Sequence, residues 1–356
     1  PAASSPAASS PAAGASAAAA SSSVSAGVSA APGSAAVSAA PGTQLVRVGA
    51  LQIVSDAGLY IARDKGYFRD AGLTVEIVNF SNLGEQIALL ATGKLDVGGG
   101  GVDAGLFNGV SRGVPLKIVA DKGSNLSPQF SSQALVVRKD LMDAGKVKSY
   151  KDLKGLNIGM SQLQNSVEEL VARALESDGL TIKDVTPKIL PFPEMNTAMA
   201  NKSIDAAVQL EPLLTVGVKQ GLFVSWKTAY EIYPDQQVAV LLYSPDFAGR
   251  RDVAQKFTTA YVHAVRDYND AFRHQKEYDQ VVDILAKGTT LKDKSLYSQV
   301  RLSGLNPDGH VNAQGLADDL AWYRKNGYVK GDLTLNQVID DSFVTQADKE
   351  LGPYSG

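Results

Sequence analysis

The chain has 356 residues, a formal net charge of −3 and no cysteine. The cysteine count excludes disulfides, thiolate catalysis and cysteine-ligated metal sites, and no apolar run in the sequence reaches the roughly 18 residues that a membrane-spanning helix needs. The slightly acidic balance supplies no basic surface, so we expect no nucleic-acid partner.

The first 42 residues differ in composition from the rest of the chain. They consist of Ala, Ser, Pro, Gly and Val, with no charged and no aromatic side chain. Such a segment cannot bury enough apolar surface to offset the cost of ordering its backbone, so residues 1–42 are predicted to form a disordered linker. An expression artefact or a glycosylated stalk is the alternative. An export signal and a lipidated cysteine just before Pro1 would account for such an arm.

The rest of the chain contains a weak internal duplication with a spacing of about 110 residues. The apolar strand around residues 48–50 corresponds to residues 158–160. Farther along, the helix end and short strand of residues 91–97 match residues 200–206. Helices and strands alternate in both copies, which is typical of parallel α/β sheets with right-handed crossovers.

The duplication predicts an α/β protein with two successive lobes. Lobe one begins with residues 43–132, lobe two takes up residues 133–243, and the chain returns to lobe one in residues 244–356. Apolar runs at residues 133–138 and 238–243 are predicted to be strands that cross between the lobes.

The last part of the chain reads as a helical tail. Ser244 followed by Pro245 is typical of a helix start. Apolar residues then recur at helical spacing, which predicts helices that pack on lobe one. They include Val253, Phe257, Tyr261, Ala264, Tyr268, Phe272, Leu316, Leu320 and Tyr323.

Candidate ligand contacts follow from the predicted sheets. In open α/β sheets, ligands bind beyond the carboxyl ends of the strands, where helix N-termini present N–H groups. The corresponding loops are residues 52–56, 80–84 and 98–103 in lobe one, and 161–166, 192–196 and 209–212 in lobe two. Candidates from these loops and from the start of the first crossing strand are Gln52, Phe80, Gly100, Asp103, Ser132, Asn165 and Glu194.

Four consecutive glycines, residues 98–101, mark one of these loops. Because they carry no side chains, they would leave backbone N–H groups uncovered for a ligand. A tight turn or close helix packing is the alternative explanation.

The loops contain more acidic than basic residues. Asp56, Asp103 and Ser166 are each placed to cap a helix, which is the alternative to ligand contact. Glu211 has a solvated loop charge as its alternative. Because Lys122 is the nearest basic candidate, a ligand that offers hydrogen-bond donors fits these loops better than a bare inorganic anion.

A hydrolase reading depends on residues 109–113, which fit the GxSxG pattern. That pattern requires a strand directly before the serine, and a helix is predicted over residues 104–108. The three histidines, His263, His274 and His310, all lie in the predicted tail without a metal-ligand spacing, so we expect neither a catalytic triad nor a metal site.

A dinucleotide-binding reading depends on Gly99, Gly101 and Ala104, which follow a predicted strand. The fingerprint should follow the first strand of its domain, whereas these residues follow the third. We therefore expect no cofactor and no enzymatic activity, with a dinucleotide-binding or hydrolytic α/β enzyme as the alternative.

Five motifs spread along the chain after the arm carry a family resemblance. They are DAGLYIARDKGYFRDAGLTVEIV (residues 56–78), LLATGKLDVG (89–98), DLKGLNIG (152–159), NKSIDAAVQLEP (201–212) and ELGPY (350–354). Their combination resembles the nitrate/sulfonate/taurine family of periplasmic solute-binding proteins. The resemblance implies a bilobal type II periplasmic-binding-protein fold and a clamp for one small organic ligand, with an ABC permease and its ATPase as partners.

The family contacts its ligands through the loops described above. The resemblance therefore extends the candidate set to Ser55, Asp56, Gly101, Val102, Gln162, Ser166 and Glu211. The ligand itself stays open among sulfonates, carboxylates, aromatic compounds and pyrimidine-like compounds. We further expect a monomer at the periplasmic or extracellular face of the cytoplasmic membrane, held there by a lipid anchor.

Overall fold

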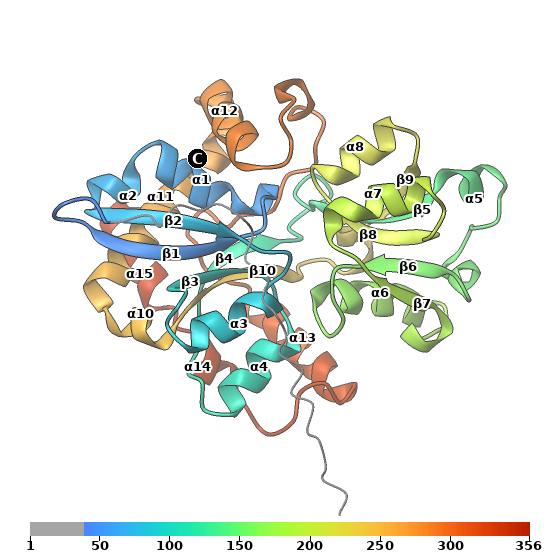
Figure 1. Ribbon diagram of the computed structural model, residues 1–356, viewed down its shortest axis with the longest axis horizontal. Coiled ribbons are helices and arrows are strands. Elements are labelled where there is room, and N and C mark those ends of the chain that lie inside the picture. Colours follow the sequence, from blue (N-terminus) through green and yellow to red (C-terminus); the bar gives the residue numbers. More distant parts are fainter. Residues whose placement is uncertain (1–38) are drawn as a thin grey trace, which may run out of the picture. The chain divides into compact units, whose positions relative to one another are not determined.

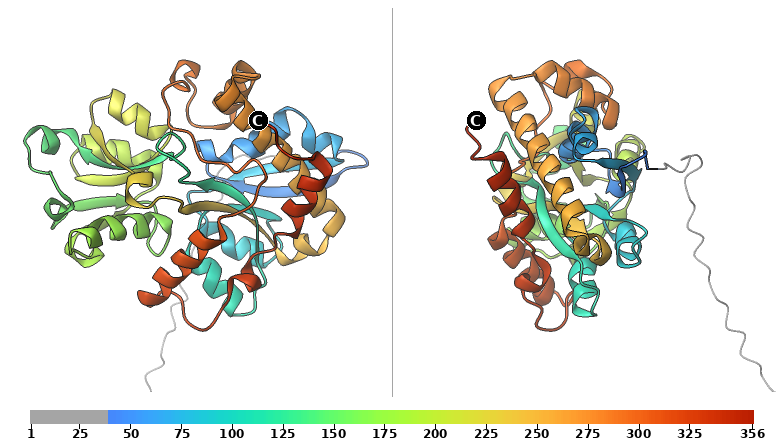
Figure 2. Two further views of the ribbon diagram at one scale, coloured as in Figure 1. Left: turned by 180° about the vertical axis from the view of Figure 1, so that it is seen from behind. Right: turned by 90° about the vertical axis from the view of Figure 1, so that its left-hand side faces the viewer.

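The computed structural model describes residues 39–356, which contain two five-stranded sheets with helices packed around each (Figures 1 and 2). Each sheet is the centre of one α/β lobe, as the duplication predicts. Nearly all of the predicted linker, residues 1–38, lies outside the described residues.

The first sheet is mixed. It contains β1 (Gln44–Ala50), β2 (Leu73–Asn79), β3 (Val97–Gly101), β4 (Lys117–Ser124) and β10 (Gln237–Tyr243), in the order β2-β1-β3-β10-β4. Strand β1 is parallel to β2 and β3, whereas β10 is antiparallel to β3 and β4.

The second sheet repeats this plan. It contains β5 (Gln133–Arg138), β6 (Asn157–Met160), β7 (Thr186–Ile189), β8 (Ala206–Leu210) and β9 (Phe223–Thr228), in the order β7-β6-β8-β5-β9. Strand β6 is parallel to β7 and β8, and β5 is antiparallel to β8 and β9. The two orders match strand for strand, so the duplication in the sequence is a duplication of the fold.

One expectation about the crossing strands needs correction. We grouped residues 238–243 with lobe two, but β10 pairs with β3 and β4 in the first sheet. The chain crosses between the sheets in the irregular segments 125–132 and 233–236, just before β5 and β10. Each sheet thus receives its antiparallel strand from the part of the chain that follows the other sheet's copy of the repeat.

Helices of similar position connect the strands of both sheets. Around the first sheet they are α1 (Ala57–Asp64), α2 (Tyr67–Asp70), α3 (Gly84–Ala91) and α4 (Ala104–Ser111). Around the second they are α5 (Lys139–Asp143), α6 (Ser166–Ser177), α7 (Phe192–Ala200), α8 (Leu213–Lys219) and α9 (Ala229–Ile232).

The predicted helical tail is confirmed and packs on lobe one. It consists of α10 (Pro245–Gly249), α11 (Arg251–His274), α12 (Tyr278–Gly288), α13 (Ala313–Lys325), α14 (Leu335–Val338) and α15 (Ser342–Leu351). The Ser244 hydroxyl accepts a hydrogen bond from the Phe247 N–H at 3.1 Å and so caps α10. Phe257, Tyr261 and Tyr268 of α11 are buried against β1 and α1, because residues at this spacing share one helix face.

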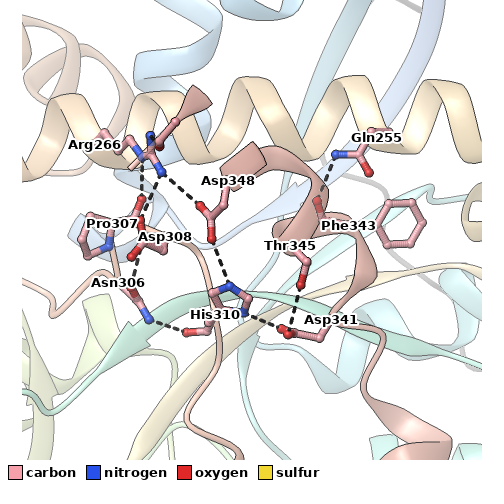
Figure 3. Close-up of polar contacts among 11 residues, drawn as sticks. Gln255, Arg266, Asn306, Pro307, Asp308, His310, Asp341, Phe343, Thr345 and Asp348 are labelled. Carbon is pink, nitrogen blue, oxygen red and sulfur yellow. Dashed lines mark hydrogen bonds and ion pairs between the residues drawn. The ribbon is translucent and has the colours of Figure 1, made fainter. Parts of the chain in front are cut away.

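A polar network fastens the last helix to α11 (Figure 3). The His310 ring lies between two carboxylates, with Nδ1 at 2.8 Å from Asp341 Oδ1 and Nε2 at 3.0 Å from Asp348 Oδ2. Arg266 of α11 donates to Asp308 at 3.1 Å and to Asp348 at 3.0 Å. Burial alone would lower the pKa of His310, but Asp341 and Asp348 outweigh burial and raise it.

This arrangement predicts a pH-dependent contribution of His310 to stability. The pKa of a raised histidine is higher in the folded chain than in the unfolded one, so its stabilising effect is complete below the unfolded pKa of about 6.5 and is lost as pH rises through the folded pKa. The His310→Gln variant should therefore be less stable than the parent near pH 5.5, and the difference should shrink toward pH 8.5. Urea unfolding at both pH values measures it.

Two further residues bear on that measurement. Burial and the charge of Asp308 raise the pKa of Asp348 despite the opposing effects of His310 and Arg266. His274, the last residue of α11, provides a matched His→Gln control away from this pair of carboxylates. Equal destabilisation of His310→Gln at both pH values would show that the charge on His310 contributes nothing.

Candidate ligand-binding site

A cavity that is partly open to solvent lies between the two sheets. The polar lining consists of Ser55, Asn82, Ser124, Asn125, Ser132, Gln133, Ser161, Gln162, Asn165, Ser166 and Ser303. The rest is apolar or glycine, namely Leu51, Ile53, Leu83, Gly101, Gly123, Val167, Phe192, Leu210, Val238 and Ala239.

The position of the cavity follows from the strand directions. Its lining residues come just after the carboxyl ends of parallel strands β1, β2 and β3 in one sheet and β6, β7 and β8 in the other. Strands β5 and β10 run antiparallel to these neighbours, so their first residues reach the same edge. Both lobes thus present the strand edge at which α/β sheets bind ligands.

Six of the predicted contact residues line the cavity, and eight do not. The six are Ser55, Gly101, Ser132, Gln162, Asn165 and Ser166. The structure shows that they line the cavity, and their contact with a ligand remains a prediction.

Three of the other eight lie on the loops or helices around the cavity. Gln52 accepts a hydrogen bond from the Thr290 N–H at 3.2 Å through its backbone carbonyl. Phe80 packs against the core formed by α3, α4 and α13. Glu194 lies exposed in the first turn of α7. Sequence placed these residues in the right loops but could not tell which side chains turn inward.

The four glycines, residues 98–101, lie within a strand, so the prediction that they form a loop is wrong. Residues 97–101 form β3, and added Cβ atoms there would clash with their surroundings. A Cβ added to Gly98 would lie 2.6 Å from Leu90 Cδ1, one on Gly99 would lie 2.7 Å from Lys122 Cε, and one on Gly100 would lie 2.9 Å from Leu83 Cβ. The glycines allow α3 and a lysine side chain to pack directly on the strand, and Gly101 is the member that lines the cavity.

Asp56 fixes the shape of the loop after β1. It is fully buried, and its Oδ2 accepts hydrogen bonds at 3.0 Å from the N–H groups of Leu51 and Ile53. Its Oδ1 lies 2.8 Å from the equally buried Lys122 Nζ. Lys122 Nζ also donates to the Ser55 hydroxyl at 3.1 Å, so this ion pair positions a residue of the cavity wall.

Asp103 and Val102 hold the start of α4. Asp103 Oδ1 accepts from the Leu106 N–H at 2.8 Å as an N-cap, and its Oδ2 accepts from Gln162 Nε2 at 3.2 Å. Burial raises the pKa of Asp103 despite these hydrogen bonds. The Val102 carbonyl accepts from the Ser166 N–H at 2.9 Å, which joins α4 of lobe one to α6 of lobe two. Neither Asp103 nor Val102 is among the residues that line the cavity.

Glu211 joins lobe two to the tail. Its carboxylate accepts hydrogen bonds from Thr215 N–H at 3.1 Å, from the Thr215 hydroxyl at 3.0 Å and from the Arg301 N–H at 3.0 Å. The side chain is buried, and burial raises the pKa of Glu211. The sequence-based alternative of a solvated loop charge is therefore wrong for this residue.

Sequence reasoning missed several lining residues, including Asn82, Asn125, Gln133, Ser161 and Ser303. Asn82 and Ser161 lay in the loops that we singled out, so the duplication was a sufficient signal for them. Asn125 precedes β5 in the first crossing segment, and Gln133 begins that strand. Ser303 comes from the tail, and nothing in the local sequence indicates its approach to the cavity.

The structure does not place the GxSxG motif or the dinucleotide-binding motif where the corresponding enzymes need them. Ser111 is the last residue of α4, so no strand leads into it as a nucleophile elbow requires. Gly99 and Gly101 lie within β3 rather than in the turn after a first strand. Within residues 39–356, no group of three or more His, Asp or Glu residues is placed to hold a metal ion.

The fold matches those of known proteins. Residues 39–285 match the NMT1-like family. The chain belongs to the NMT1-like family. No curated protein sequence matches this NMT1-like chain. None of the helices in residues 39–356 is both long and apolar enough to cross a membrane.

Solved structures similar to this NMT1-like chain include binding components of import systems. The ligand-binding component of an ABC-type import system from Staphylococcus aureus, with zinc bound, has a TM-score of 0.71 and 16% identity, covering 86% of this chain and 99% of that one. The periplasmic nitrate-binding protein NrtA from Synechocystis PCC 6803 has a TM-score of 0.71 and 14% identity, covering 87% and 89%. The aliphatic sulphonate binding protein SsuA from Escherichia coli has a TM-score of 0.65 and 20% identity, covering 85% and 99%.

The same fold also occurs in an enzyme. The desulfurization enzyme DSZB has a TM-score of 0.58 and 16% identity, covering 87% of this chain and 100% of that one. These likenesses establish the type II periplasmic-binding-protein fold for the NMT1-like chain. Because both binding proteins and an enzyme have this fold, the fold alone does not determine the function of the chain.

The buried ion pair beneath the cavity predicts a large effect of one substitution. Lys122→Met leaves the Asp56 carboxylate buried without its partner, which should lower the free energy of unfolding by about 3–5 kcal/mol. The matched control is Lys139→Met, which breaks an exposed pair with Asp143 at 2.7 Å and should cost about 0.5 kcal/mol or less. Urea unfolding measures both variants, and similar losses for the two would contradict this role of Lys122.

Proposed function

We propose that this NMT1-like chain is the solute-binding protein of an ABC importer. It closes on a small organic ligand and delivers it to a membrane permease and its ATPase. The observation that carries the proposal is a cavity lined from the carboxyl ends of both sheets, so that one ligand contacts both lobes at once. The nitrate- and sulphonate-binding proteins of similar fold support the same reading.

The proposed moving bodies follow the sheets rather than the order of the chain. Lobe one comprises residues 43–124 and 237–356, and lobe two comprises residues 133–232. Segments 125–132 and 233–236 connect them and serve as the hinge. A ligand favours the closed form only through its extra affinity for that form, which requires contacts from both lobes.

Contacts between the lobes surround the proposed closed cavity. Asp103 and Asn165 form an isolated bridge, and the Ala104 N–H donates to the Gln164 carbonyl at 2.8 Å. Farther out, the Tyr328 hydroxyl of the tail donates to Glu168 of α6 at 2.7 Å. We expect these contacts to stabilise the closed form.

The chain is proposed to act as a non-enzymatic monomer on the extracytoplasmic side of a membrane, with a lipid anchor ahead of the arm. The binding components of similar fold support an extracytoplasmic place.

Ligand binding should stabilise the chain, and filling the cavity should abolish the effect. At 100 times its dissociation constant, a ligand adds about 2.7 kcal/mol to the apparent stability. In a thermal-shift panel of sulfonates, nitrate, carboxylates, carboxamides and pyrimidines, at least one organic compound should raise the melting temperature by several degrees. Ser132→Trp, which fills the cavity, should remove that shift.

Ser203→Trp is the matched control, since Ser203 is exposed in lobe two and is not among the residues that line the cavity. It should keep the ligand-induced shift. The proposal fails if no organic compound stabilises the chain, or if stabilisation is confined to nucleotide cofactors such as NAD.

Closure should depend on the outer contact between the lobes. Tyr328→Phe removes a hydrogen bond made only when the lobes meet, so it should weaken the affinity for the stabilising compound by about 0.5–1.5 kcal/mol. Tyr354→Phe is the control, because the Tyr354 hydroxyl donates to Asp270 at 2.8 Å within the tail. Calorimetry measures both affinities, and small-angle scattering should show a smaller radius of gyration with ligand. Tight binding without compaction would reject the clamp.

A further inference from the structure

The lining of the cavity carries no formal charge. Among the described residues that line it, none is Asp, Glu, Lys, Arg or His. An anionic ligand would therefore have to be held by backbone N–H groups at helix N-termini and by neutral side chains. This point deepens the proposed function and rests on it.

The N–H groups of the two helices that meet beside the cavity are already bonded within the protein. At α6, the Ser166 N–H donates to Val102, and the N–H groups of Val167 and Glu168 donate to Asn165 Oδ1 at 3.0 and 3.1 Å. At α4, the Ala104 N–H donates to the Gln164 carbonyl, and the Leu106 N–H donates to the Asp103 carboxylate. An anion at the start of either helix would have to displace these bonds.

The charges behind the wall also oppose an anion. Lys122 is neutralised by Asp56 at 2.8 Å. Asp103 and Glu211 are both buried. Asp103 accepts a hydrogen bond from the lining residue Gln162, and Glu211 accepts one from the backbone N–H of Arg301 in the tail. An anionic ligand would meet carboxylates of the same sign in a region of low dielectric constant, where repulsion is stronger than in water.

Gln133 carries a buried acceptor without a donor. The residue lines the cavity and is 4% exposed, and its Oε1 is itself shielded from solvent and finds no hydrogen-bond partner among the described residues. A buried carbonyl without a hydrogen-bond partner destabilises the folded state. A ligand N–H group that reaches Gln133 would remove this cost on binding.

Donors face the same space. The Ser55 hydroxyl oxygen accepts from Lys122 Nζ, so its own hydrogen is available to a ligand. The amide oxygen of Asn165 is committed to the start of α6, which leaves its amide nitrogen as the group for a ligand. Leu51, Phe192 and Leu210 add apolar surface to the wall.

We propose that the cavity binds an uncharged ligand with a carboxamide or lactam edge on an apolar body, and that Gln133 determines this specificity. The N–H of the ligand donates to Gln133 Oε1, while its carbonyl accepts from Ser55 or Asn165. The apolar body lies against the leucine and phenylalanine side chains.

The test compares compounds that differ in charge but little in shape. Calorimetry on the full chain uses benzamide with benzoate, nicotinamide with nicotinate, and benzenesulfonamide with benzenesulfonate. In each pair that binds, the uncharged member should bind at least roughly tenfold more tightly, or about 1.4 kcal/mol. Its affinity should also change little between about 0.05 and 0.5 M salt, since no charge is screened.

Substitution of Gln133 separates recognition from stability. Gln133→Met keeps the size of the side chain but removes the unpaired carbonyl, so it should weaken binding of the uncharged compound at least roughly tenfold while leaving the ligand-free melting temperature unchanged or higher. Gln209→Met is the matched control on the neighbouring strand. Gln209 donates to Phe192 at 3.1 Å and to Asn196 at 2.8 Å, so its loss should lower the melting temperature.

The outcomes separate this inference from the function on which it rests. Tighter binding of benzoate, nicotinate or benzenesulfonate than of the uncharged partner would overturn the inference and leave the solute-binding function intact. So would stabilisation by nitrate or an alkanesulfonate with no binding in any of the three pairs, or unchanged affinity in Gln133→Met. Failure of every compound in both panels would reject the binding function itself.

Discussion

The structure depends on an exchange of strands between the two halves of the chain. Strand β5 follows the first copy of the repeat but pairs in the second sheet, and β10 follows the second copy but pairs in the first. The chain must therefore cross between the sheets just before each of these strands. Since both antiparallel strands enter at the carboxyl ends of their neighbours, the crossings tie together the two sheet edges at which ligands bind.

That constraint accounts for three buried carboxylates beside the cavity. The loops at the strand ends need fixed shapes, and buried carboxylates provide them by accepting backbone N–H groups. Asp56, Asp103 and Glu211 each do so, for the loops after β1, β3 and β8. A buried carboxylate is costly unless it is paired or hydrogen-bonded, which accounts for the buried position of Lys122.

A second buried cluster lies where α6 of lobe two meets α13 of the tail. Arg173 donates to Glu169 at 2.7 Å, and the Tyr233 hydroxyl donates to Asp319 at 3.0 Å. Burial raises the pKa of Asp319 well above its ordinary value, with the Glu169 charge adding to the effect. The lobes thus meet through polar groups as well as apolar ones, which is consistent with the opening and closing proposed for them.

Local pattern in the sequence determined the two α/β copies, the helical tail and the loops around the cavity, because each depends on apolar periodicity or on glycine and proline within a few residues. Six of the fourteen predicted contacts accordingly line the cavity. Tertiary structure alone decided that β10 joins the first sheet, that the glycine run lies inside β3, and that Gln133 faces the cavity unpaired. Strand partners and the partners of buried polar groups lie tens to hundreds of residues away, as Asp56 and Lys122 do, and no local periodicity specifies them.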